Sequence, residues 1–168
     1  MQQSIIDFSK KTFGENMLLD YSNFNVFINK EKVNQKGLVL NDVKQKFKTF
    51  LLSQNFISNV FTEEEIQNSG SNNQLLQIIS NGYDPKQNGE LVLLFKPGFM
   101  EYSSTGTTHG SPYSYDTHVP CLFYGWKIKK GESFNKKTIT QIAPTLAQKL
   151  KITMPNGTQS EVLEEILK

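Results

Sequence analysis

The stretch "GELVLLFKPG" (89–98) decides the fold that we expect for this chain. It holds an uninterrupted apolar run and ends in a Pro-Gly pair, which is typical of a turn. A short apolar run bounded by turn residues indicates a strand that is covered on both faces. We therefore predict a buried strand here, with the rest of the fold arranged around it.

Helix and strand patterns alternate upstream of this run. Residues 24–29 alternate apolar and polar side chains, as a half-buried strand does, and residues 56–62 predict a further strand. Between them, 38–54 predicts a helix with Asn41 as N-cap and its apolar residues on one face. Shorter helices are expected over 5–13, 62–70 and 72–83. The region 22–98 is thus predicted to form a small α+β lobe.

Two further elements are expected downstream. The apolar run "VPCLFYG" (119–125) predicts a buried central strand, and 135–152 predicts an amphipathic helix. Pro144 suits that helix if its regular part begins near Ala143, because proline is tolerated in a first turn. The apolar residues of the helix recur every three or four positions, at Ile139, Ile142, Leu146 and Leu150. This order of elements is typical of a layered α/β domain.

Composition limits the classes of function. The chain has 168 residues, the usual length of one domain, and 37% of them are hydrophobic. All 18 basic residues are Lys, against 16 acidic residues, for a net charge of +2. The absence of Arg weighs against sequence-specific recognition of nucleic acid, although codon bias in an AT-rich genome explains it equally well. No apolar run is long enough to span a membrane, the N-terminal residues do not have the pattern of a signal peptide, and Cys121 excludes an intrachain disulfide.

The loop "GTTHGSPYSYDTHVP" (106–120) holds both histidines of the chain, His109 and His118, with Asp116 between them. Imidazoles beside a carboxylate, in a loop between two predicted strands, suit zinc. A catalytic zinc takes about three protein ligands, however, and no compact ligand pattern occurs here. Metal ligation and purely structural histidines therefore both remain open. A serine hydrolase is disfavoured because no G-x-S-x-G pattern is present, and Asp116 also suits a turn that hydrogen-bonds its own backbone.

A family resemblance changes this balance. The stretch "LVLLFKPGFMEYSSTGTTHGSPYSYDTHVPCLFYGWKIKKGE" (91–132), followed by "ITQIAPTLAQKLKITMPNGTQSEVLEEIL" (139–167), resembles the C-terminal part of bacterial alkaline phosphatases of the phosphate-irrepressible type. Their superfamily also contains the type I phosphodiesterases and nucleotide pyrophosphatases. The likeness is strong over 89–168 and extends into the more variable region upstream.

The resemblance implies a C-terminal segment of an alkaline-phosphatase-like layered α/β fold. Residues 1–168 would then form a single incomplete domain, in which the lobe over 22–98 feeds the central strands. The part from 99 to 168 would carry the metal-ligand loop, a core strand and the C-terminal helix.

The resemblance also implies a site with two zinc ions, at which a Thr or Ser nucleophile is phosphorylated and then hydrolysed. His109 falls on the position of a direct zinc ligand. His118 is expected to support the loop, with Asp116 orienting it, and Thr108 to be a neighbour of the metal at most. The nucleophile and the other ligands of the family, including an Asp-His pair in a D-H-G pattern, have no counterpart that we recognise in this chain. We therefore expect a phosphate ester substrate for the parent enzyme and no activity from these residues alone.

Other interpretations remain. The chain could be an inert remnant or a partner-binding module, a phosphodiesterase or nucleotide pyrophosphatase segment, or an independent metal-binding domain that uses both histidines and Asp116. Its expected partners are the missing N-terminal part and, for the isolated chain, further copies of itself, since two-sided apolar strands would otherwise stay uncovered. Nucleic acid is not an expected partner. A periplasmic or secreted location is expected if the protein is like its family.

Overall fold

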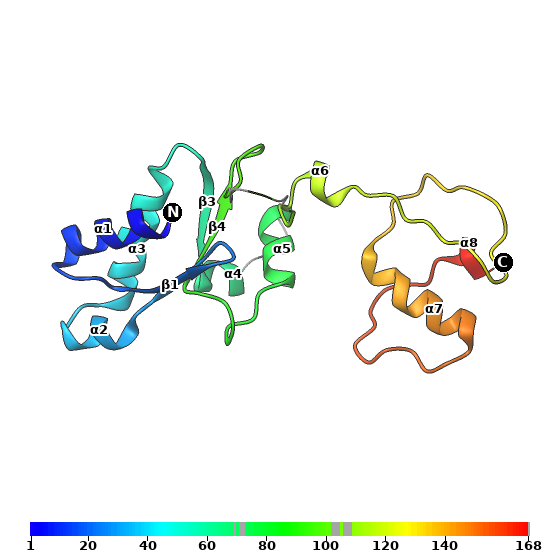
Figure 1. Cartoon of the computed structure of the whole chain (residues 1–168). Helices are drawn as coiled ribbons and strands as arrows, with labels where there is room; N and C mark the ends of the chain where they lie inside the picture. The colour runs from blue at the N-terminus through cyan, green and yellow to red at the C-terminus, as the bar shows by residue number, and fades with distance from the viewer. Residues whose placement is uncertain (69, 71–72, 102–104, 106–108, 168) are drawn as a thin grey trace. The chain divides into compact units, whose positions relative to one another are not determined.

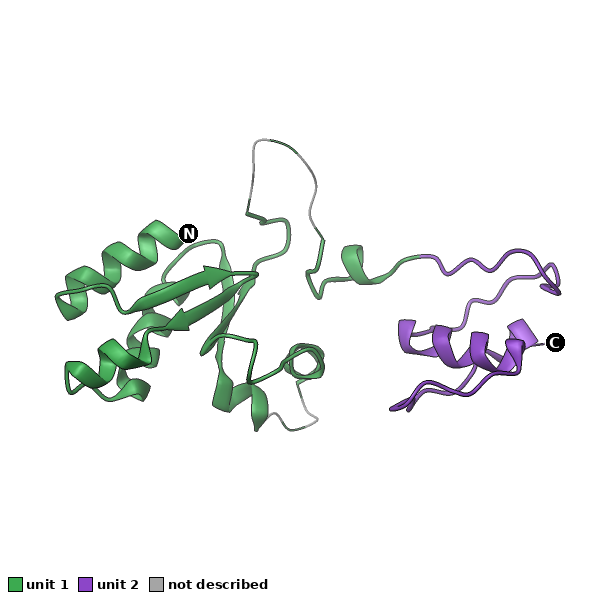
Figure 2. Cartoon of the chain, turned by 60° about the horizontal axis from the view of Figure 1, so that its bottom comes forward, with its two compact units in different colours: residues 1–119 green, residues 120–168 purple. Residues whose placement is uncertain are grey.

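The computed structural model describes every residue except 69, 71–72, 102–104, 106–108 and 168 (Figure 1). The chain divides into two compact units, which we call unit 1 (1–119) and unit 2 (120–168) (Figure 2). The lobe predicted over 22–98 lies within unit 1. In the ranges that the structure describes, no helix has the length and apolar character needed to cross a membrane.

A four-stranded antiparallel sheet forms the centre of unit 1 (Figure 1). Its strands lie in the order β1-β2-β4-β3, so β4 pairs with a strand on each side. The bounds are β1 Leu18–Ser22, β2 Asn25–Ile28, β3 Ile57–Thr62 and β4 Leu91–Phe95. Leu91, Leu93 and Phe95 are buried, which confirms the buried strand predicted from the apolar run.

Helices supply the rest of the unit 1 core. They are α1 Gln2–Phe13, α2 Lys30–Gln35, α3 Leu40–Leu52, α4 Glu63–Gln67 and α5 Gln74–Asn81. Helices α1 and α3 meet through aromatic rings: Phe47 lies 5.6 Å from Phe8 and 5.8 Å from Phe13, measured between ring centroids. Apolar side chains of both helices and of the sheet form one buried cluster. The mixed α/β class expected from the sequence is therefore present.

Some local predictions for unit 1 need correction. Helix α3 begins at Leu40 with Val39 as N-cap and no side-chain cap, so the prediction of Asn41 as N-cap is wrong. The helix is stabilised by the burial of its apolar face, and it does not depend on a cap. Helix α1 ends as predicted at Gly14, whose φ of 80° needs the left-handed conformation.

The turn into β4 depends on a glycine with no room for a side chain. A Cβ on Gly89 would lie 2.4 Å from the carbonyl oxygen of Val26 in β2. We expect Gly89→Ala to destabilise the protein by about 1–3 kcal/mol, because backbone atoms of the sheet must move to accept the methyl group. Chemical denaturation measures this loss. The matched change Gly82→Ala has no contact closer than 3.8 Å and should cost little, so equal losses in the two variants would contradict the steric explanation.

Unit 2 contains helices but no strand among the residues that the structure describes. Its elements are the 3-10 helix η1 Ile139–Gln141, α7 Ile142–Leu150 and α8 Glu164–Leu167. Helix α7 begins at Ile142, which places Pro144 in the first turn, as predicted. The buried strand predicted over 119–125 is wrong for this structure, because Leu122 and Tyr124 are exposed. A strand needs a neighbour to complete its hydrogen bonds, and none lies beside this segment in the described part of the chain.

Candidate site in the histidine loop

The loop after β4 is held to the end of that strand by two tyrosines. The Tyr113 hydroxyl donates a 2.6 Å hydrogen bond to the carbonyl oxygen of Phe95, the last residue of β4. The Tyr115 hydroxyl accepts a 3.3 Å hydrogen bond from the amide of Gly98, and the two tyrosine rings stack with centroids 5.8 Å apart. These contacts fix the short helix α6 (Ser114–Thr117) relative to the sheet. Sequence reasoning missed both tyrosines, although they flank the predicted site residues.

Asp116 organises the loop from within α6. One of its carboxylate oxygens accepts hydrogen bonds from the Ser111 amide at 3.0 Å and from the Ser111 hydroxyl at 2.5 Å. These two bonds lower the pKa of Asp116 below its usual range, and the charge of His109 lowers it further. The expected turn at Asp116 is therefore present, but the carboxylate reaches back five residues along the chain.

The Ser111 contact gives a prediction that can be measured directly. Because hydrogen bonds to the ionised carboxylate favour it, Ser111→Ala should raise the pKa of Asp116 towards its ordinary value, as followed by carboxyl NMR titration. Since the folded pKa is depressed, the stabilising contribution of this carboxylate is present above the unfolded pKa and is lost as pH falls through the folded one. The neighbouring change Ser114→Ala should leave the titration where it is. A depressed pKa that survives Ser111→Ala would refute the assignment.

The two histidines occupy different positions. The amide of His118 donates to the Ser114 carbonyl oxygen at 2.8 Å, which makes His118 the C-cap of α6, and its side chain is exposed. His109 is exposed on the preceding part of the loop and lies close enough to Asp116 to act on its pKa. Thr108, predicted as a neighbour of the metal, lies outside the described residues.

The described residues do not form a complete metal site. Within the ranges described, no group of three or more His, Cys, Asp or Glu side chains is arranged to hold a metal ion. The independent metal-binding domain built on His109, Asp116 and His118 is therefore not supported. The donor set fits a single ligand from this loop, because Asp116 is engaged by Ser111 and His118 caps α6.

Comparison with known proteins gives a consistent class. No protein-family model matches the chain. It is 34% identical over 160 residues to an alkaline phosphatase, PafA, of Elizabethkingia meningoseptica, covering 94% of this chain and 29% of that protein. It is 33% identical to a calcium-transporting ATPase of Myroides odoratus over 87% of the chain and 27% of that protein. It is 30% identical to the alkaline phosphatase PhoV of Synechococcus elongatus over 75% of the chain and 23% of that protein.

A solved structure extends the likeness to three dimensions. The crystal structure of wild-type alkaline phosphatase PafA superposes with a TM-score of 0.90 and 32% identity, covering 100% of this chain and 33% of that one. The class is therefore that of bacterial α/β proteins with this sheet and loop. More particularly, the chain is alkaline-phosphatase-like and corresponds to part of such a protein. It spans less than a third of the length of these curated relatives.

Proposed function

We propose that the chain forms one part of a phosphatase that hydrolyses phosphate esters. The observation that carries this proposal is the likeness to an alkaline phosphatase along the whole chain, at 32% identity and a TM-score of 0.90. The geometry of the loop agrees with it, because Tyr113 and Tyr115 fix the histidine loop at the end of a buried strand. Active-site residues are commonly presented in this way, on a loop positioned by a rigid scaffold.

Within this proposal, His109 is one ligand of a zinc site that has two ions in the complete enzyme. A zinc pair stabilises the charge on both the attacking and the leaving oxygen of the phosphate ester. Asp116 acts differently, because its two hydrogen bonds to Ser111 fix the turn that carries the histidine. His118 supports the same turn as the C-cap of α6.

The remaining chemistry belongs to residues outside this chain. A Thr or Ser nucleophile takes the phosphoryl group and is then hydrolysed, and the other zinc ligands lie with it in the rest of the enzyme. Each zinc needs about three protein ligands, and this loop supplies one. We therefore expect the 168-residue chain by itself to release no p-nitrophenol from p-nitrophenyl phosphate with zinc present. We also propose an extracytoplasmic location, which cell fractionation tests.

A graft protein tests the proposal. In it, residues 1–168 replace the matching 29% of the Elizabethkingia meningoseptica phosphatase. The graft protein should hydrolyse p-nitrophenyl phosphate in a manner that chelators abolish and zinc restores. A soluble, folded graft protein without activity would count against this chain as a phosphatase segment.

A further inference from the structure

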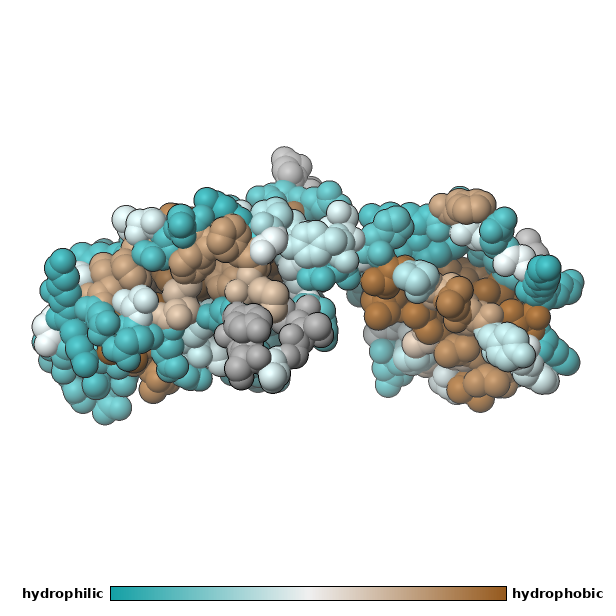
Figure 3. All heavy atoms as spheres, turned by 45° about the horizontal axis from the view of Figure 1, so that its top comes forward, coloured by the Kyte–Doolittle hydropathy of each residue, from teal (hydrophilic) through white to brown (hydrophobic). Residues whose placement is uncertain are grey.

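Unit 2 leaves most of its large apolar side chains uncovered. Figure 3 shows hydrophobic atoms gathered on one face of this unit. Among its described residues, the fully buried hydrophobic side chains are Pro144, Ala147 and Leu163. The exposed ones are Leu122, Tyr124, Trp126, Phe134, Ile139, Leu146, Leu150, Ile152 and Met154. Contiguous apolar surface of this kind marks an interaction site.

The first part of this surface is the segment 120–125, which we call the docking segment. Its sequence is that of a strand covered on both faces, yet Leu122 is 89% exposed and the neighbouring Cys121 is exposed as well. Within the described part of the chain, no hydrogen bond joins residues 120–124 to another segment. Both the side chains and the backbone of the docking segment are thus available to a partner.

The second part is the outer face of helix α7. An amphipathic helix normally turns its apolar stripe towards the core. Here Leu146 and Leu150 of that stripe are exposed, while Thr145 is fully buried on the inner face. The Thr145 hydroxyl donates to the Gln141 carbonyl oxygen at 2.6 Å and accepts from the Leu163 amide at 2.8 Å, which fixes this orientation. The apolar stripe therefore belongs to an interface outside unit 2.

We propose that the docking segment and the outer face of α7 bind the remainder of a phosphatase polypeptide, with the docking segment added as a strand to a sheet of that part. The occupant follows from the comparison: the backbone of this chain matches, along its whole length, one third of a solved phosphatase chain. The same backbone thus occurs where about two thirds of a further chain are available to cover the apolar face. This inference rests on the phosphatase assembly proposed above.

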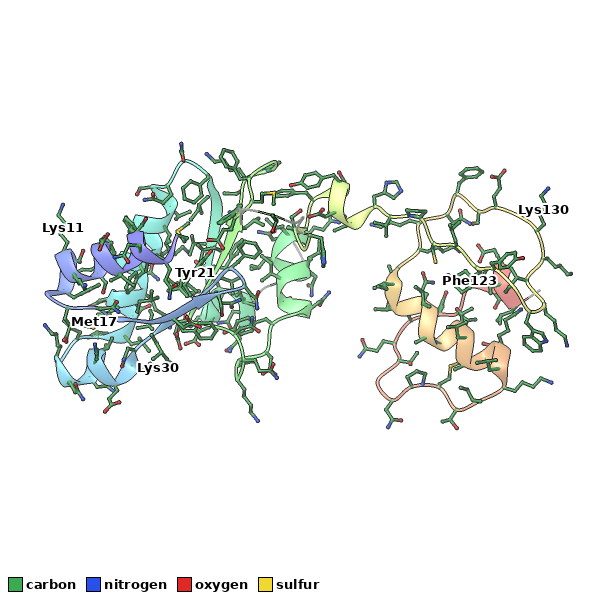
Figure 4. All side chains as sticks on the ribbon, in the orientation of Figure 1. Lys11, Met17, Tyr21, Lys30, Phe123 and Lys130 are labelled. Atoms are coloured by element: carbon green, nitrogen blue, oxygen red, sulfur yellow. The ribbon has the colours of Figure 1, made fainter. Side chains whose placement is uncertain are left out.

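The surface also indicates the chemistry of its partner. The docking segment lines a hollow of about 440 Å³ with the residues that follow it, Ile128 to Gly131. Figure 4 shows that Phe123 and Lys130 come from this same irregular stretch. Lys127, Lys129 and Lys130 stand along its edge. The partner therefore presents an apolar surface with an open strand edge and acidic groups at the rim.

Cys121 makes the proposal testable, because the only cysteine of the chain lies in the docking segment and is exposed. N-ethylmaleimide should modify Cys121 rapidly in the isolated chain. In the graft protein, the modification should be about 100-fold slower, since the thiol reacts only after local opening. Mass spectrometry of the Cys121 peptide measures the rate, and amide hydrogen exchange over 120–125 should slow in parallel.

Matched variants separate docking from catalysis. Leu122→Asp should restore fast labelling of Cys121 in the graft protein, whereas Val39→Asp, at an exposed position of unit 1, should not. His109→Ala should abolish hydrolysis and leave Cys121 protected, so a failure of the proposed function is distinguishable from a failure of docking. Fast labelling and exchange in the folded graft protein would overturn the proposal. So would protection of Cys121 in the isolated chain, whether as a monomer covered by its own residues or as a dimer covered by a second copy.

Discussion

Replacing His109 by Ala should lower kcat/KM of the graft protein for p-nitrophenyl phosphate by about 1,000-fold or more, which corresponds to about 4 kcal/mol of transition-state stabilisation. The reason is that the proposed zinc site receives one imidazole from this chain and has no substitute among the described residues of the loop. Metal analysis of the purified variant should show less than the full complement of zinc. Steady-state kinetics at saturating zinc distinguishes weakened binding of the metal from a defect in chemistry.

His118→Ala is the matched control, because it removes the same side chain nine residues further along the loop. His118 contributes its backbone to the end of α6, so its loss should cost about 10-fold or less, as a supporting residue would. Equal losses at the two positions would remove the distinction between ligand and support. Full activity of His109→Ala would exclude it as a zinc ligand.

The sequence predicted best those elements that complete their contacts locally. The strand β4, the apolar face of α3 and the beginning of α7 follow directly from periodicity and turn residues. The strand β1 was missed because its hairpin turn lacks the usual Asn-Gly pair: Asn23 and Phe24 take φ values of 47° and 61° without any glycine. A phenylalanine in this conformation carries no turn signal in the sequence.

The candidate site was predictable only in part, for a similar reason. The His109, Asp116 and His118 pattern could be recognised, but the bond from Tyr113 to Phe95 joins residues 18 positions apart, and periodicity does not report such contacts. The segment 119–125 is the opposite case. Its pattern describes burial on both faces, and the described chain supplies no neighbouring strand to provide it. That pattern is therefore satisfied only when a partner covers the segment.

Phe47→Ala should destabilise unit 1 by about 3–5 kcal/mol. The Phe47 side chain is 0% exposed and lies between the rings of Phe8 and Phe13, so truncation leaves a cavity that helices α1 and α3 can fill only by moving. For a unit of this size, the loss corresponds to a fall in Tm of about 10–20 °C. Far-UV circular dichroism measures it, since the sheet and most helices belong to unit 1.

The same substitution at Phe134 separates core packing from a general effect of losing an aromatic side chain. Phe134 is 91% exposed in unit 2, so Phe134→Ala should leave the Tm of unit 1 unchanged. In the graft protein, Phe47→Ala should lower the temperature at which activity is lost and leave kcat near that of the parent at low temperature, because β4 still holds the Tyr113 contact while unit 1 is folded. A large loss of kcat at low temperature would show that the α1 and α3 packing sets the position of the histidine loop. A loss of less than about 1 kcal/mol would contradict the close packing of these three rings.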